Sequence, residues 1–472
     1  MIAIIEKVYQ FLWGDWIVLP LPGGSSFRLS LLVLILIPAG IWFTIRTRFL
    51  PIRLFPDMLH ALFEKKGKEE GESHNSTLSA LQTLIVSTAT RVGMGNLVGV
   101  VAAISAGGAG AVFWMWVTAL IGSSTAFVEA TLAQIYKEKD PVYGGYRGGP
   151  AYYMHRFIQE KRGGKKKRYV GISVLFAISG LICWCGISQV ISNSVTSAFH
   201  NAFHIPPIYT TVVLVALAAV IIFRKTATVK VLDVLVPVMA GCYFLITVIL
   251  ICMNFSALPG VFSRIFEEAF GIRQAVAGGL GTVVMNGVKR GLFSNEAGSG
   301  SAPCAAAAAE SDQPVKLGLT QALGVFIDTI VICSCTAMIM LLTPESLTEG
   351  AVGMELLQAA MGYHLGQFGV IFIAATLWLF SFSTFLGILY YARSNVSYLF
   401  GDGMLPQNLY KVLALVMMFI GGLAAYTVVW DLGDVGVGLM TVFNIIMLYP
   451  MSGIAMKALK SYETEKKNRK KG

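Results

Sequence analysis

Long apolar segments alternate with short polar loops over nearly the whole sequence. Most reach about 20 residues, the length of an α-helix that crosses a hydrocarbon core of about 30 Å. The pattern predicts an all-α polytopic membrane protein with about eleven transmembrane helices and no soluble domain between them. We place the helices at residues 28–46, 78–106, 110–136, 168–200, 207–223, 230–253, 274–308, 315–342, 366–392, 411–429 and 436–456. The composition agrees, with a mean hydropathy of +0.68 and a charged fraction of 13%, about half that of a soluble domain.

Two of the apolar segments are interrupted in the same way. The first breaks at Gly93-Met94-Gly95-Asn96, and the second breaks across residues 291–300. A continuous helix over 78–106 would be about 43 Å long, so a break or a strong tilt is expected there. Non-helical backbone inside a bilayer must be buried in protein or line a cavity. In secondary transporters such paired breaks, one in each half, mark the substrate and ion site near the midplane.

Basic residues are distributed unevenly between the two sides of this topology. Of the 36 Lys and Arg residues, 29 fall in the loops of one side and in the C-terminal tail, and four fall on the other side. By the positive-inside rule we expect a plasma (inner) membrane protein with its N-terminus outside and its C-terminus in the cytoplasm. This distribution explains the net charge of +10 without a nucleic-acid partner. The basic run at 466–471 either only sets the topology or also touches anionic lipid.

One N-terminal span precedes two groups of five, and each group opens with a broken span. Because five is odd, the second group enters from the opposite side, which gives a five-plus-five inverted repeat with the pocket between its halves. The expected organisation is an external interfacial segment and first span at 1–49, a cytoplasmic loop at 50–77, a first repeat at 78–253, an external loop at 254–273, a second repeat at 274–456 and a basic cytoplasmic tail at 457–472.

The first break carries groups suited to a zwitterion and a cation. Gly93 and Gly95 let the backbone leave helical angles, which frees N–H groups at the start of the second half-helix for a substrate carboxylate. Carbonyls left over from the first half-helix, near Ala89 and Val92, suit a hard cation such as sodium. The alternative is a Gly-x-Gly that only permits close helix packing. The second break in the matching place favours the functional interpretation.

The second break concentrates polar side chains at membrane depth. Five of them are Ser294, Asn295, Glu296, Ser299 and Ser301. Such groups are costly there unless they face partners or a cavity. The alternative is a loop between two short spans, which would add one crossing and place the basic tail outside, against the charge distribution.

Six ionisable residues fall within the predicted spans: Arg91, Glu129, Lys289, Arg290, Glu296 and Asp328. With three charges of each sign they can pair completely, which favours structural pairing that braces the broken helices. Two alternatives stay open. Glu129 or Glu296 would serve as a proton relay, or Arg91 would hold a substrate carboxylate by a bidentate pair.

Further candidates lie on two other spans. Trp378 lies near mid-span, which favours a pocket wall over an interface anchor. Ser383 and Thr384 would complete a cation site with carbonyls of the first break, or would only hydrogen-bond their own helix. Gln189 either binds a zwitterion or joins helices.

Several stretches resemble the alanine/glycine:cation symporters. They are Gly93-Met94-Gly95-Asn96, Gly148-Gly149-Pro150-Ala151-Tyr152-Tyr153, Arg290 through Pro303, and Thr44-Ile-Arg46 through Phe55-Pro56. The resemblance implies the leucine-transporter fold, sodium coupling and a small neutral amino acid as substrate. It implies an amino-acid pocket formed by the backbone at Gly93, Met94 and Gly95 with Asn96, Gln189, Phe293, Ser294, Asn295 and Trp378. It also implies sodium ligands at Ala89, Val92, Ser383 and Thr384. Met94 replaces a threonine frequent between the family's glycines, which changes pocket size or polarity.

The leading hypothesis is therefore a sodium-coupled symporter that imports alanine and/or glycine by alternating access. The sequence has no nucleotide-binding motif, so an ion gradient must supply the energy, and no cofactor is expected beyond the coupling ion. The expected partners are the amino acid, sodium and membrane lipid, with no obligate protein partner evident. Alternatives are a proton-coupled or glutamine/serine-selective symporter of the same fold, or a channel. The sequence lacks His-Glu-x-x-His and Gly-x-Ser-x-Gly, which argues against an intramembrane enzyme.

Overall fold

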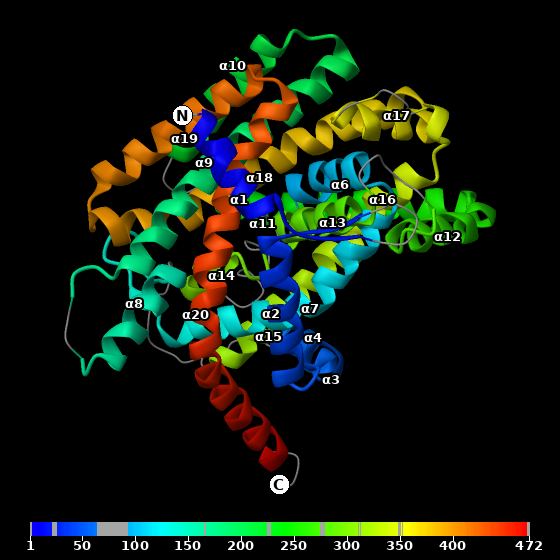
Figure 1. The fold of residues 1–472 in the computed structure, drawn as a ribbon. Helices are drawn as coiled ribbons and strands as arrows, with labels where there is room; N and C mark the ends of the chain where they lie inside the picture. The colour runs from blue at the N-terminus through cyan, green and yellow to red at the C-terminus, as the bar shows by residue number, and fades with distance from the viewer. Residues whose placement is uncertain are drawn as a thin grey trace.

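A computed structural model describes residues 2–20, 26–63, 93–164, 167–223, 228–273, 279–309, 311, 313–347, 351 and 353–469. Within these ranges the chain forms a bundle of helices with two small antiparallel hairpins, of which the first packs against α13 and α2 (Figure 1). The predictions for Ala89, Arg91 and Val92 lie outside the described residues.

The N-terminal part packs onto the end of the bundle. Helix α1 (Ile2–Trp13) leads into the hairpin of β1 (Asp15–Pro20) and β2 (Ser26–Ser30), which are joined antiparallel. The Ser30 hydroxyl then caps the next helix by accepting from the Val33 backbone N–H at 3.3 Å. Trp13 is buried, and its indole N–H donates to the Asp434 carbonyl at 3.0 Å. Helix α1 is thereby attached to the last helix of the chain.

The remaining elements of the first half are α2 (Leu31–Arg46), α3 (Leu50–Arg53), α4 (Phe55–Phe63), the π-helix η1 (Gly95–Gly99), α6 (Val100–Gly107), α7 (Gly110–Ile135), β3 (Glu138–Lys139), β4 (Tyr146–Arg147), α8 (Pro150–Lys161), α9 (Gly171–Phe203), α10 (Pro207–Phe223) and α11 (Thr228–Met253). A short 3-10 turn, η2 (Phe255–Ala257), connects α11 to α12 (Leu258–Ala269). The chain bends by 77° at that connection.

The second half consists of α13 (Gly279–Asn295), α14 (Ala302–Ala308), α15 (Pro314–Val325), the π-helix η3 (Phe326–Cys333), α16 (Ser334–Leu341), the 3-10 turn η4 (Glu345–Leu347), α17 (Met354–Leu365), α18 (Gln367–Phe400), α19 (Met404–Leu423) and α20 (Tyr426–Arg469). Two helices organise the packing. Helix α7 packs against α2, α13 and α15, and α9 packs against α18, α19 and α20 (Figure 1).

Six helices of the described chain are long and apolar enough to cross a membrane, or seven if the bent pair counts as one span. Three further apolar helices, at 31–46, 95–107 and 207–223, are shorter. The prediction of several membrane-crossing helices is therefore supported, and the total of about eleven stays a prediction. The largest difference in length between a predicted span and the observed helix is at α20. The span is predicted over 436–456, and the helix runs from Tyr426 to Arg469.

Glycines allow the central helices to approach each other closely. A Cβ atom on Gly186 of α9 would lie 2.3 Å from the backbone N of Gly433 in α20. A Cβ on Gly436 would lie 2.3 Å from the Cα of Cys183. Backbones in direct contact gain van der Waals packing that a membrane helix pair cannot obtain from the hydrophobic effect. This contact fixes α20 against α9.

Candidate functional site

The two predicted breaks contact each other in the core. A Cβ on Gly95 would lie 3.4 Å from the Ser294 Cα and 3.6 Å from the Phe293 carbonyl oxygen. One helical turn later, a Cβ on Gly99 would lie 3.6 Å from the Phe293 ring. The glycines therefore leave the room in which η1 and α13 meet. None of the described glycines of the first break has a positive φ, so they contribute close approach here and not a left-handed turn.

From Gly95 the first break continues as a π-helix. The five residues Gly95–Gly99 are all buried, and α6 follows directly. A π turn inside an α-helix is rare and is frequent at functional sites. Here the side-chain amide of Asn96, which is buried, contacts groups on the second half of the chain.

A buried polar cluster joins η1, α13 and η3. The Ser294 hydroxyl lies 3.1 Å from Asn96 Oδ1 and 2.9 Å from Asp328 Oδ2. The Asn96 side-chain N–H donates to the Asp328 carbonyl at 3.3 Å, and the Thr336 hydroxyl donates to the Asn96 carbonyl at 2.8 Å. All of these side chains are buried. The predicted site residues Asn96 and Ser294 are thus in direct contact, and Asp328 belongs to the same cluster.

Helix α18 reaches the first break through Thr384. The Met94 backbone N–H donates to the Thr384 hydroxyl oxygen at 3.2 Å. The neighbouring Ser383 hydroxyl instead donates to the Phe380 carbonyl of its own helix at 2.9 Å. Both hydroxyl oxygens keep a lone pair for another partner. The structure therefore brings one of the two predicted hydroxyls into contact with the break.

The second break is present, but it begins later than the sequence pattern indicated. Helix α13 continues through Gly291, where a Cβ would lie 2.3 Å from the Thr118 hydroxyl. That glycine serves close packing against α7 and does not unwind the helix. The left-handed backbone appears at Glu296, Gly298 and Gly300, with φ of 56°, 94° and 84°.

Glu129 of α7 supports the unwound segment. Its Oε2 accepts the Gly298 backbone N–H at 3.0 Å, and its Oε1 accepts from the Asn444 amide. Asn444 also donates to the Gly298 carbonyl at 3.0 Å and accepts from the Tyr153 hydroxyl. The carboxylate thus accepts a hydrogen bond from a backbone N–H group in the unwound segment, which is a structural role. The sequence analysis missed Asn444, although an amide inside the apolar span 436–456 was a signal.

Lys289 and Arg290 have a partner that the sequence analysis did not assign. Arg290 forms a bidentate pair with Asp434, with N–O distances of 2.9 and 3.2 Å. Lys289 lies 2.8 Å from the same carboxylate. The predicted pairing of these two cations with Glu129, Glu296 or Asp328 was wrong for this reason. The span predicted at 436–456 excludes Asp434, because the hydropathy of α20 becomes high only from residue 436 onward.

The predicted aromatic and amide residues each contact a different neighbour. Phe293 contacts Trp430, with ring centroids 5.0 Å apart. Trp378 is partly buried and contacts Phe199 at 5.0 Å. A Cβ on Gly421 of α19 would lie 2.3 Å from the Gln189 Cα, so this part of α9 is packed against α19. Trp430 was missed because it lies in the turns of α20 that the sequence pattern did not include.

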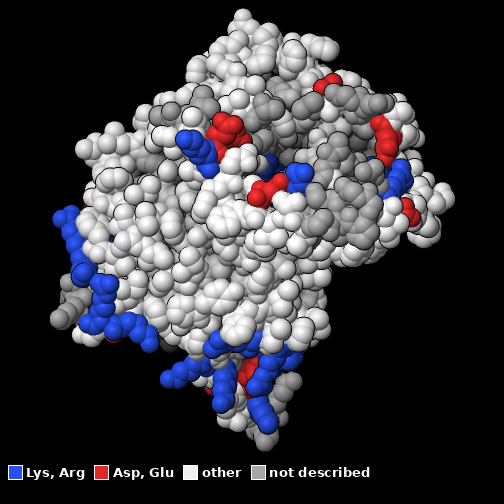
Figure 2. All heavy atoms as spheres, viewed as in Figure 1, with Lys and Arg blue, Asp and Glu red and all other residues white. Residues whose placement is uncertain are grey.

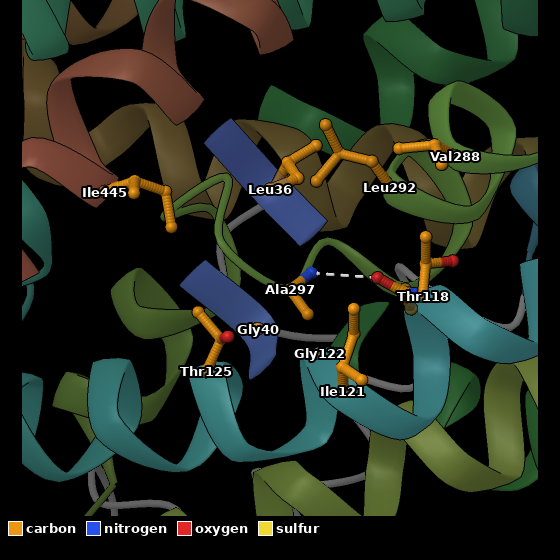
Figure 3. A pocket seen from close by; sticks show the side chains of 11 residues that line it. Leu36, Gly40, Thr118, Ile121, Gly122, Thr125, Val288, Leu292, Ala297 and Ile445 are labelled. Carbon is orange, nitrogen blue, oxygen red and sulfur yellow. Dashed lines mark hydrogen bonds between the residues drawn. The ribbon is translucent and has the colours of Figure 1, made fainter. Parts of the chain in front are cut away.

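A cavity of about 20 Å³ lies on the other side of α13 (Figure 3). Side chains from α2, α7, α13 and α20 line it. The Asn295 Oδ1 accepts the Ala297 N–H at 3.0 Å. Its side-chain nitrogen is buried and has no hydrogen-bond partner among the described residues. This volume holds about one water molecule, which would satisfy that donor, and is too small for an amino acid.

Long apolar helices, two broken segments in contact and buried polar groups at the contact define a polytopic membrane transporter. The chain belongs to the sodium:alanine symporter family, whose model matches residues 23–472. This finding confirms the resemblance derived from the sequence motifs and the prediction that the chain is a symporter-family transporter and not an enzyme.

Curated relatives are similar over nearly their whole length. The amino-acid carrier protein AlsT of Bacillus subtilis is 41% identical over 447 residues, covering 94% of this chain and 91% of the relative. The probable sodium/glutamine symporter GlnT of the same organism is 41% identical over 442 residues, covering 93% and 89%. The sodium/alanine symporter AgcS of Methanococcus maripaludis is 33% identical over 474 residues, covering 100% and 99%.

A crystal structure of the manganese transporter from Eremococcus coleocola has a similar fold. The TM-score is 0.52, with 11% sequence identity over 83% of this chain and 81% of that chain. At this identity the likeness concerns the fold alone.

Proposed function

We propose that this chain is a sodium-coupled symporter that imports a small neutral amino acid, alanine and/or glycine, by alternating access. The observation that carries the proposal is the contact between Gly95 and Ser294, which joins the two breaks, together with the Met94–Thr384 hydrogen bond. Family membership and the names of the relatives supply the coupling ion and the substrate class.

The amino acid would bind at the junction of the breaks. Backbone N–H groups at Gly93, Met94 and Gly95, where the first break meets η1, would hold the substrate carboxylate, and the Met94 N–H would exchange its present acceptor, the Thr384 hydroxyl, for it. Asn96, Ser294 and Asn295 would contribute polar contacts. Phe293 would limit the space for the substrate side chain, and Gln189 and Trp378 remain candidates for the pocket wall opposite.

The sodium ion would lie where α18 meets the first break. The hydroxyl oxygens of Ser383 and Thr384 and the carbonyls of Ala89 and Val92 are hard oxygen ligands, the type that alkali cations prefer in transporters. The Thr384 hydroxyl already accepts from Met94 N–H, which supports its place beside the break. Arg91, Glu129 and Glu296 are proposed as structural charges.

The proposed orientation keeps the N-terminus outside and the C-terminus in the cytoplasm. Figure 2 shows Lys and Arg side chains gathered at the lower end of the molecule, around the C-terminal part of α20, below a broad uncharged band. A band without charge between charged ends is typical of a membrane-spanning surface, and the more basic end belongs on the cytoplasmic side. The two halves around the breaks would form the inverted repeat.

Uptake into proteoliposomes tests the proposal. Purified protein is expected to accumulate labelled alanine or glycine when an inward sodium gradient is imposed and to accumulate none when potassium replaces sodium. Serine and glutamine are tested in parallel, because a relative named for glutamine is 41% identical. Full accumulation driven by a proton gradient without sodium would overturn the proposed coupling. Equilibration without accumulation would indicate a channel.

A further inference from the structure

A groove lies at the basic end of the molecule, between the end of α2, α3 and the C-terminal part of α20. Its volume is about 650 Å³, enough for a phospholipid headgroup and the glycerol behind it. Five basic side chains line it, namely Arg46, Arg48, Arg53, Lys460 and Lys467, against a single carboxylate, Glu463. Figure 2 shows this concentration of basic side chains around the lower end of α20.

Glu463, the one carboxylate among the described residues that line the groove, is already paired with a cation. Glu463 lies 2.7 Å from Arg53. Asp57 of α4 forms an ion pair with Lys466 of α20. Within the described residues, no carboxylate comes within ion-pair distance of Arg46, Arg48, Lys460 or Lys467. Among the described residues, these four positive charges line one space with no carboxylate paired to them.

The end of α2 is shaped in a way that holds this surface in place. Arg48 and Phe49 have φ of 57° and 54°, two successive left-handed residues that are not glycine. The Arg53 guanidinium donates to the carbonyls of Thr47 and Arg48, each at 3.2 Å. A strained backbone that is fixed by side-chain hydrogen bonds often marks a functional surface.

Exposed apolar side chains flank the basic groove. Ile52 is 78% exposed and Ile45 is 59% exposed. Trp42 is 46% exposed, and its ring centroid lies 6.3 Å from that of Tyr449 and 5.7 Å from the Arg46 guanidinium. Trp and Tyr prefer the level of lipid headgroups, with cations just outside them and aliphatic side chains toward the acyl chains. The surface therefore offers contacts to both ends of one lipid.

We propose that this groove binds the phosphodiester headgroup of an anionic phospholipid, with its acyl chains beside Ile45 and Trp42. The positive charges of α2 and α20, which otherwise repel each other, would be neutralised by one bound headgroup. The lipid would then hold the C-terminal half of α20 against α2. Because α20 also carries Asn444 and Asp434, lipid binding at this end supports the helix that contacts both α7 and α13.

Thermal unfolding of the purified full chain in detergent measures this binding. Phosphatidylglycerol is expected to raise the unfolding midpoint in a saturable manner, and phosphatidylcholine is expected to have little effect. Inorganic phosphate and glycerophosphoglycerol, which lack acyl chains, separate a lipid site from a site for free anions. A shift of equal size with either soluble anion would overturn the lipid assignment. The assay does not depend on transport, so its failure leaves the proposed symport untouched.

A charge-matched pair of variants locates the site. Arg46→Gln with Arg48→Gln and Lys460→Gln removes three charges from the groove. Arg156→Gln with Lys161→Gln and Arg168→Gln removes three from α8 and the loop after it. Each basic residue near an anionic lipid contributes about a factor of five, so the first variant should bind phosphatidylglycerol about 100-fold more weakly and the second nearly normally. Equal weakening in both would show general surface attraction and overturn the site. If the first variant does not fold, the charge-conserving Arg46→Lys with Arg48→Lys should restore folding and binding.

Discussion

The Ser294 hydroxyl has more hydrogen-bond acceptors around it than protons to donate. It carries one proton, yet acceptor oxygens of Asn96 and Asp328 lie at 3.1 and 2.9 Å. Only one of them can accept that proton at a time. The junction of the two breaks therefore has two hydrogen-bond arrangements of similar geometry. Under the proposed function, a change between them would accompany a change of the site's shape.

Ser294→Ala is expected to lower thermal stability by about 1–3 kcal/mol, because a buried acceptor loses its donor. Under the proposed function, apparent affinity for alanine should fall as well. Ser381→Ala is the matched control, since the Ser381 hydroxyl only donates to the Trp378 carbonyl within its own helix. Thermal unfolding and sodium-driven uptake of both variants measure the difference. Equal effects of the two substitutions would contradict a special role for Ser294.

Substitution of Glu129 distinguishes between two roles for this residue, a structural charge and a proton relay. Its two oxygens accept from Gly298 N–H and from the Asn444 amide, so Glu129→Gln would place an amide N–H₂ opposite a donor. We expect a loss of stability of about 1–3 kcal/mol and weaker uptake at every pH. A relay would behave differently. Normal stability, with uptake that has lost only its response to a proton gradient, would indicate the relay.

At the scale of elements, hydropathy predicted helices well where a long apolar run outweighs the polar residues within it. The helix predicted at 207–223 is Pro207–Phe223, and the one predicted at 110–136 is Gly110–Ile135. It failed at the start of α20, where charged residues and glycines come before the apolar run. The first turns of α20 contain Asp434, whose charge is buried only because Arg290, 144 residues away in the sequence, pairs with it. No local pattern contains that information.

The position of the second break shows the same limit. Three glycines at 291, 298 and 300 offered several places at which the helix could unwind. The structure uses 298 and 300 for left-handed backbone and uses 291 for contact with Thr118. The residue type permits either role, and the neighbouring helix decides between them. The sequence could therefore predict that a break exists, but not at which residue it begins.

Gly186 tests the contact between α9 and α20. A Cβ at this position would lie 2.3 Å from the Gly433 nitrogen and 2.6 Å from its Cα, and backbone cannot move aside as a side chain can. Gly186→Ala should therefore destabilise the protein by about 1–3 kcal/mol. Gly171→Ala, at the start of the same helix with nothing within 4 Å, should be nearly neutral. Thermal unfolding of the two variants compares them directly. Tolerance of alanine at 186 would show that the two helices are less tightly packed.

At the scale of the whole molecule, one carboxylate ties together segments from both ends of the chain. Asp434 of α20 binds Arg290 and Lys289 of α13, and its carbonyl accepts from Trp13 of α1. Lys289 also donates to the Tyr9 hydroxyl at 2.7 Å. Two cations therefore share one fully buried anion. The exposed Asp431 also attracts both cations, more weakly than the directly paired Asp434.

This imbalance of charge predicts which substitutions in the cluster destabilise the protein most. Asp434→Asn leaves two buried cations without a counter-charge and should cost about 3–5 kcal/mol of stability. Lys289→Met removes the surplus cation and leaves the bidentate Arg290–Asp434 pair intact, so its cost should be much smaller. Adding Lys289→Met to Asp434→Asn should recover part of the loss, because one of the uncompensated charges is gone. Thermal unfolding of the three variants, with sodium-driven uptake in parallel, measures the order. If Lys289→Met proved as damaging as Asp434→Asn, the cluster would depend on the Lys289–Tyr9 contact instead of on its charge balance.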